Sequence, residues 1–224
     1  MIIEKILFIQ TAFPGDVILT LPALEQLKSF FPNSSIDVLC IPATKEIFSA
    51  SPFVDQAIAI DKRGKHKSLL SNYKFVKQLK QNNYTRIYSS HRSLRTSLIV
   101  LLLEVRESFG FDNSALFHVY KNLVFYDSSK HEVQRNLDLV GFKYDDKNWR
   151  IIPQIVTSEQ SVEKIKSYIS QNNLVNRFVA IAPGSVWKTK KYPSEYFEVI
   201  IKHFVDRKIN VVLIGGKNKK TICD

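Results

Sequence analysis

Short apolar runs alternate with helix-like segments along this chain, and that alternation limits the folds open to it. An apolar run at residues 5–9 indicates a buried strand, and further strand-like segments lie at residues 35–40, 53–60, 86–90 and 107–111. Segments with helical spacing lie at residues 17–27, 44–50, 71–81, 95–103 and 132–140, the last before a C-cap glycine, Gly141. A strand–helix alternation of this kind is typical of a parallel sheet covered by helices, so we expect an α/β fold.

The alternation breaks once and then restarts. Residues 147–156 lose their periodicity around Pro153, which predicts a boundary between a domain of residues 1–152 and a second domain of residues 153–224. The second domain is expected to hold a helix at 158–171, a strand at 177–182, a helix capped by Ser194 and a strand at 210–216. Two strands cannot complete a sheet domain, so the second domain is predicted to be incomplete in this chain.

Composition narrows the class of protein and its partners. With 45% hydrophobic and 24% charged residues, the chain reads as globular. The formal net charge of +11 favours acidic partners such as a phosphorylated substrate or an anionic membrane surface. No nucleic-acid motif is present, so a nucleic-acid partner is not expected.

The cysteines and the apolar runs indicate the cellular compartment of the protein. Cys40 and Cys223 are too far apart to indicate a disulfide framework or a metal site, which favours a reducing compartment. The N-terminus lacks the features of a signal peptide, and the longest apolar run, residues 98–103, is too short to span a bilayer. A cytoplasmic protein with peripheral contact to an anionic membrane is the expectation.

The loop at residues 11–16 joins the first strand to the first helix, where open α/β sheets bind ligands. Asp16 is the only acid in that loop. Two interpretations stay open: Asp16 caps the helix, as Asp commonly does, or it acts as a general base. Pro22 leaves a similar choice, because it either kinks one long helix or marks the start of a later one.

A second loop, residues 183–193, follows the strand of the second domain and carries small residues and three lysines. A carboxylate on one loop can take a proton from an attacking hydroxyl, while lysine and backbone N–H groups on the other stabilise a departing phosphate. This pairing suits transfer of a group from a phosphorylated donor. The first loop lacks the Gly-x-Gly-x-x-Gly pattern, which argues against the other candidate class, an epimerase or dehydrogenase.

Two motifs carry a family resemblance. Residues 15–24, GDVILTLPAL, resemble the N-terminal signature of the family 9 glycosyltransferases, the heptosyltransferases of lipopolysaccharide core assembly. Pro183-Gly184-Ser185 followed by Lys190-Lys191-Tyr192-Pro193 resembles the second signature, where Trp is more usual than Tyr192. Segments 91–95, 110–112 and 131–133 also resemble family positions, in the same order.

The resemblance implies a GT-B fold, with two Rossmann-like domains facing a cleft. It implies an inverting transferase that moves a heptose from a nucleotide-sugar, ADP-heptose, to a lipid-anchored lipopolysaccharide core acceptor. No obligatory metal or other cofactor is implied. The N-terminal domain would hold the acceptor and the C-terminal domain the donor, at the cytoplasmic face of the inner membrane.

The resemblance also assigns residues. Asp16 would be the catalytic base, and Lys190 would contact the donor phosphate as charge builds on the leaving group. Donor-binding residues would be Gly184, Ser185, Gly215 and Gly216. Acceptor-binding residues would be Gly15, His91, Arg92 and Arg95.

One family feature is missing from the chain. The donor-binding loop, an Asp-Ser-Gly stretch followed by a nearby His, does not occur before Asp224. This leaves two alternatives. The chain is a fragment of an active transferase, or it is a truncated and inactive homologue that only binds an anionic glycolipid or a partner.

Overall fold

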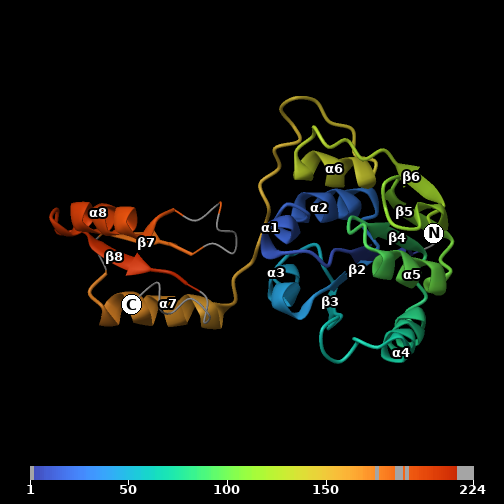
Figure 1. Ribbon diagram of the computed structural model, residues 1–224, viewed down its shortest axis with the longest axis horizontal. Helices are drawn as coiled ribbons and strands as arrows, with labels where there is room; N and C mark the ends of the chain where they lie inside the picture. The colour runs from blue at the N-terminus through green and yellow to red at the C-terminus, as the bar shows by residue number, and fades with distance from the viewer. Residues whose placement is uncertain (1–2, 175–176, 185–188, 190–191, 216–224) are drawn as a thin grey trace. The chain divides into compact units, whose positions relative to one another are not determined.

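The computed structural model describes residues 3–174, 177–184, 189 and 192–215, and the chain divides into two compact units (Figure 1). The first unit is Met1–Thr157 and the second is Ser158–Asp224, whereas the sequence analysis placed the boundary after residue 152. The backbone N–H of Val156 donates to the carbonyl of Ala50 at 2.7 Å. The first unit therefore continues past Pro153.

The first unit is built on a six-stranded sheet in the order β3-β2-β1-β4-β5-β6, with every neighbouring pair parallel. Its strands are β1 Lys5–Ile9, β2 Ser35–Cys40, β3 Gln56–Ala59, β4 Arg86–Ser89, β5 Glu107–Phe111 and β6 Asn122–Val124. This is the order of the doubly wound dinucleotide-binding fold. β6 is an edge strand that was not predicted from the sequence.

Helices cover both faces of this sheet (Figure 1). They are α1 Pro14–Ile18, α2 Leu21–Phe30, η1 Pro42–Thr44, α3 Lys45–Ser49, α4 Leu69–Lys80, α5 Leu94–Leu103, η2 Phe117–Val119 and α6 Glu132–Leu139. Alternate side chains of β1 serve the two faces: Ile6 and Phe8 join one buried cluster, and Leu7 and Ile9 join the other. The first cluster packs under α2 and α3, and the second under α4 and α5. Strands buried on both faces explain the unbroken apolar runs in the sequence.

The first predicted helix is divided into two. α1 ends at Ile18, and α2 begins at Leu21 with Pro22 in its first turn. Proline is favoured in a first turn because the N–H that it lacks has no partner there. The choice left open for Pro22 is thus settled: it starts a new helix. The side-chain amide of Asn136, on α6, donates to the carbonyl of Leu19 at 3.3 Å, which satisfies an acceptor at the break.

The second unit, taken by itself, has two parallel strands and two helices in its described part. They are α7 Glu159–Gln171, β7 Phe178–Ile181, α8 Ser194–Val205 and β8 Asn210–Leu213. Ser158 caps α7, where its hydroxyl accepts from the N–H of Ser161 at 3.2 Å. The predicted cap of α8 is wrong, because Pro193 occupies the N-cap and Ser194 is the first helical residue.

Candidate active site at the carboxyl edge of the first sheet

The sheet order reverses between β1 and β4, which lie side by side in the middle of the first sheet. At such a switch point the loops leaving the two strands turn to opposite faces and open a crevice at the carboxyl edge. The loop after β1 carries Asp16, and the loop after β4 carries His91 and Arg92. The topology therefore brings Asp16 and His91 to the same crevice, although they lie 75 positions apart in the sequence (91 − 16).

A polar pocket of about 290 Å³ lies at this point. It is lined by residues from the two loops, from the segment after β6 and from the first turn of α6: Gln10, Ala12, Asp16, Ser90, His91, Arg92, Ser93, Tyr126 and Glu132. Three of the residues predicted from the sequence, Asp16, His91 and Arg92, share it. Hydroxyl, amide, carboxylate and guanidinium groups in one pocket are suited to a ligand rich in hydroxyl groups.

Asp16 sits in the first turn of α1, on a backbone fixed from below. The buried hydroxyl of Thr20 donates to the carbonyl of Asp16 at 2.8 Å. Gln10, also buried, donates from its side-chain amide to the Thr20 hydroxyl at 3.1 Å, and its amide oxygen accepts from the N–H of Ala12 at 3.3 Å. The loop and the start of α1 are thus held by one connected hydrogen-bond network.

The capping interpretation of Asp16 is wrong. Phe13 occupies the N-cap of α1 and makes no side-chain cap bond, and Asp16 lies three residues further on. Within the described part of the chain, no hydrogen bond or ion pair is recorded for the Asp16 carboxylate. Its oxygens are therefore free to accept a proton or a hydrogen bond from a ligand.

His91 enters the pocket as a neutral ring at pH 7. Burial lowers its pKa to about 4, and the nearby charges of Lys62 and Arg92 act in the same direction. Its Nδ1 lies 3.0 Å from the hydroxyl of Thr96, which fixes the ring on the first turn of α5. A neutral imidazole can donate and accept hydrogen bonds to a ligand without adding charge.

Arg92 carries the positive charge of the pocket, alone among its described lining residues. Its guanidinium lies 4.0 Å from the ring centroid of Tyr126, a cation–π contact. The backbone N–H of Tyr126 donates to the carboxylate of Asp112 at 2.9 Å. Asp112, one of the segment positions flagged by the resemblance, therefore acts on the pocket by holding Tyr126 in place.

Glu132 is a second carboxylate in the pocket, and it was not among the predicted site residues. It opens α6, and the guanidinium of Arg135 donates to its Oε2 from Nε at 3.1 Å. Arg135 also lies 4.9 Å from the ring centroid of Tyr126. The sequence signal was the segment 131–133, which was noted as a family position without a role.

Arg95 and Gly15, which were also predicted to bind the acceptor, do not line the pocket. The guanidinium of Arg95 donates to the carbonyls of Lys62 and His66 at 3.2 and 3.4 Å, so its hydrogen bonds hold the loop of residues 61–67. Gly15 lies in α1 with nothing within 4 Å of the place where a Cβ would stand. The acceptor-binding roles predicted for both remain predictions.

In the second unit, Gly184 and Gly215 are exposed and follow β7 and β8, the two paired strands, at their carboxyl ends. These two predicted donor-binding residues thus share one edge of that sheet. Ser185, Lys190 and Gly216 lie outside the described residues.

Metal clusters and membrane-spanning helices are both absent from the described residues. No group of three or more His, Cys, Asp or Glu side chains there is placed to hold a metal ion. No helix in the same part of the chain is both long and apolar enough to cross a membrane.

Fold and pocket together define a doubly wound α/β protein with a polar ligand site at its switch point. The model of glycosyltransferase family 9, the heptosyltransferases, matches residues 72–224, which is more than half of the chain. The chain belongs to this family.

Known relatives agree in fold and differ in length. Lipopolysaccharide heptosyltransferase 3 of Escherichia coli is 24% identical over 220 residues, which cover 92% of this chain and 62% of the relative. The crystal structure of a family 9 glycosyl transferase from Veillonella parvula is similar at a TM-score of 0.87 and 20% identity, over 99% of this chain and 66% of that chain. E. coli heptosyltransferase WaaC, solved with ADP, is similar at a TM-score of 0.71 and 20% identity, over 98% of this chain and 69% of that chain.

These likenesses confirm the predicted fold class, an α/β protein of the GT-B type with parallel sheets. The chain spans about 62% of the length of the first of these relatives.

Proposed function

We propose that this chain is an inverting glycosyltransferase that moves a heptose or a related sugar from a nucleotide-diphosphate donor to a lipopolysaccharide core acceptor. The observation that carries the proposal is the shared pocket of Asp16, His91 and Arg92 at the switch point of the first sheet. Family membership supports the reaction class. The pocket would take the acceptor, because its lining is suited to hydroxyl groups and to one anionic group.

In this proposal Asp16 is the general base. The acceptor hydroxyl oxygen attacks the anomeric carbon of the donor sugar, the bond from that carbon to the phosphate oxygen breaks, and the hydroxyl proton passes to the Asp16 carboxylate. The unoccupied carboxylate and the fixed backbone beneath it support this role.

The other pocket residues would bind the acceptor. Arg92 would pair with an acidic group, a carboxylate or a phosphate, since a guanidinium held on a ring is preorganised for such oxygens. Neutral His91 and the carboxylate of Glu132 would bind sugar hydroxyls. Gly15 would leave room for the acceptor beside Asp16, and Arg95 would act through the loop that it holds.

The donor would bind the second unit. WaaC was solved with ADP, and the donor proposed here is correspondingly ADP-heptose. Gly184 and Gly215 would let the backbone approach the nucleotide, with Ser185 and Gly216 beside them. Lys190 would stabilise the departing diphosphate. No obligatory metal is proposed, and the reaction is placed at the cytoplasmic face of the inner membrane, where a lipid-anchored acceptor would be reached.

The test is Asp16→Asn in the 224-residue chain, with ADP release measured from ADP-heptose and a lipid-anchored core acceptor. We expect transfer to fall by about 10²–10⁴, the usual contribution of a general base, while acceptor binding and the melting temperature are kept. Asp146→Asn, at an exposed carboxylate outside the pocket, is the matched control and should retain full activity.

Two outcomes would change the conclusion. Undiminished transfer by Asp16→Asn would remove Asp16 from the base role. If the unmodified chain binds the acceptor and releases no ADP, then sugar transfer by these 224 residues is wrong and acceptor binding is the activity that they retain.

A further inference from the structure

One stretch of the chain has an extreme charge pattern that the proposed reaction does not use. Residues 62–103 contain ten Lys and Arg residues and no Asp or Glu. The stretch covers the loop after β3, helix α4, strand β4 and helix α5. A run of charged residues is commonly just a solvated surface. The arrangement of its side chains therefore decides whether it could also bind a partner.

The loop of residues 61–67 has a defined backbone. The carboxylate of Asp61 accepts from the N–H groups of Gly64 at 2.8 Å and of Arg63 and Lys65 at 3.2 Å each. Arg95 holds the same loop through three of its carbonyls, those of Lys62, His66 and Lys67. The only acid of the loop is therefore bonded to backbone, while the side chains of Arg63, Lys65 and Lys67 are exposed.

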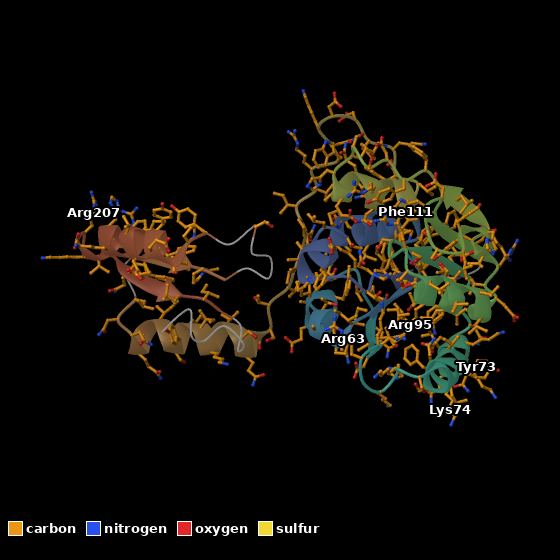
Figure 2. All side chains as sticks on the ribbon, in the orientation of Figure 1. Arg63, Tyr73, Lys74, Arg95, Phe111 and Arg207 are labelled. Carbon is orange, nitrogen blue, oxygen red and sulfur yellow. The ribbon has the colours of Figure 1, made fainter. Side chains whose placement is uncertain are left out.

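Helix α4 continues this surface with two distinct faces. Val76 and Leu79 are buried in the core beneath the helix. The opposite stripe, at helical spacing, carries Leu70, Tyr73, Lys74 and Lys77, all exposed. Figure 2 shows Tyr73 and Lys74 on the outer side of α4, away from the sheet.

Two features separate this surface from an ordinary solvated face. Leu70 is 65% exposed and Tyr73 is 54% exposed, so apolar side chains stand among the cations. In addition, within the described residues no ion pair engages the exposed cations of the surface: Arg63, Lys65, Lys67, Lys74 and Lys77. Lys80, at the end of α4, is different, because it pairs with Glu104 at 2.5 Å.

We infer that this surface, defined as Arg63, Lys65, Lys67, Leu70, Tyr73, Lys74 and Lys77, docks the protein on an anionic phospholipid bilayer. Unpaired cations are attracted to the negative surface potential of such a bilayer. An exposed leucine and tyrosine match the boundary between headgroups and acyl chains, where aromatic and apolar side chains partition. A second copy of the chain is a poor occupant, because both surfaces would carry the same charge.

The loop that carries Arg63, Lys65 and Lys67 is bonded to segments that form the pocket. The ammonium group of Lys62, in the same loop, donates to the hydroxyl of Thr11 in the loop that leads to Asp16, at 2.5 Å. Arg95 links the loop to α5, whose first turn also holds His91 through Thr96. A bilayer on this surface would therefore lie beside the pocket, where a lipid-anchored acceptor would arrive.

The test is sedimentation of the 224-residue chain with vesicles of phosphatidylcholine alone, or of phosphatidylcholine with about one third phosphatidylglycerol. We expect binding to the anionic vesicles at low salt, much weaker binding at high salt, and little binding to the neutral vesicles. Lys74→Glu combined with Lys77→Glu should weaken binding by at least about 20-fold, since each basic residue at such a surface contributes about fivefold. Leu70→Ser combined with Tyr73→Ser should weaken the part of binding that survives high salt.

The matched control is Lys121→Glu combined with Lys143→Glu, which makes the same change in net charge at exposed lysines outside the acid-free stretch. It should bind nearly as well as the unmodified chain. An equal loss of vesicle binding in the control and in the α4 variant would show that binding depends on net charge alone, and would overturn the proposed docking surface. Unchanged vesicle binding by the α4 variant would overturn it as well. Preference for RNA over anionic vesicles, or self-association blocked by the α4 substitutions, would also overturn it.

Thermal melting followed by circular dichroism shows whether each variant is folded. Vesicle binding requires no sugar transfer, so the docking proposal and the proposed function can each fail without the other.

Discussion

Among single residues, His91 shows how burial controls charge in the pocket. Its pKa is lowered from 6.5 to about 4 by burial, with further lowering by Lys62 and Arg92. Between these two values the unfolded chain binds a proton that the folded chain does not, so the free energy of unfolding rises with pH across this window and falls as the pH drops from about 6.5 towards 4.

This predicts a specific effect of His91→Asn. From pH 7 to pH 5, the unmodified chain should lose about 1 kcal/mol more unfolding free energy than the variant, a figure reduced for the partial exposure of the ring. Urea unfolding at the two pH values measures the difference. His118→Asn, at an exposed histidine outside the pocket, should follow the unmodified chain. Parallel pH dependence of the unmodified chain and of His91→Asn would contradict the lowered pKa.

The residues that line the pocket show how much of the site could be predicted from the sequence. Asp16 was singled out as the only acid in the loop after the first strand, while His91 and Arg92 were assigned by the family resemblance. The structure brings the three together because parallel strands end at one edge of the sheet. Tyr126 and Glu132 were missed because they reach the pocket from β6 and α6, beyond a strand of only three residues, Asn122–Val124. Such a strand gives no clear period-2 pattern. Arg95 was grouped with the acceptor residues by the resemblance of segment 91–95 to a family position, which cannot show that its guanidinium bonds to the carbonyls of another loop.

Among the elements, β5 depends on a glycine for its packing. A Cβ on Gly110 would stand 2.5 Å from Cδ1 of Tyr120, a buried ring whose hydroxyl donates to the hydroxyl of Ser89 at 3.3 Å. Gly110→Ala should therefore displace this ring from the end of β4 and lower the free energy of unfolding by about 1–3 kcal/mol, the usual cost of overpacking.

Gly15→Ala is the matched substitution, because a Cβ there meets nothing within 4 Å and the residue lies in a helix. We expect its free energy of unfolding to be unchanged or raised by up to about 1 kcal/mol. Denaturant titration of the two variants provides the comparison. Equal stability of Gly110→Ala and the unmodified chain would show that Tyr120 can move aside at no cost.

Some boundaries of the helices and strands are determined by the local sequence, and others by tertiary contacts. The strands at residues 5–9, 35–40 and 107–111 were predicted with their observed bounds, because each has a local strand pattern: an apolar run in the first and alternation of polar and apolar residues in the second. The break between α1 and α2 was missed as a definite feature because residues 17–27 are almost wholly apolar. At the break, the side chain of Asn136, which is distant in sequence, donates to the carbonyl of Leu19, and the side chain of Gln10 donates to the hydroxyl of Thr20.

At the scale of the whole chain, the two units differ in how much they bury. The first unit has a continuous core on both faces of its sheet. In the described part of the second unit, α7 and α8 contain no buried residue, and Leu174 and Ile181 are the buried hydrophobic side chains. Two strands and two helices with so little buried apolar surface are marginally stable, so the second unit should open locally far more often than the first.

Limited proteolysis with a protease of broad specificity tests this difference. We expect early cuts in the exposed residues 154–158 and throughout the second unit, and a resistant fragment close to Met1–Thr157. Mass spectrometry identifies the fragment, and its thermal unfolding should remain a single cooperative transition because it retains both core clusters. A full-length band that resists cleavage as long as the first unit does would contradict the difference in stability.

If the donor binds where proposed, addition of ADP-heptose should slow the cuts in the second unit and leave the rate of cleavage in the first unit unchanged, since a ligand stabilises the unit that it binds.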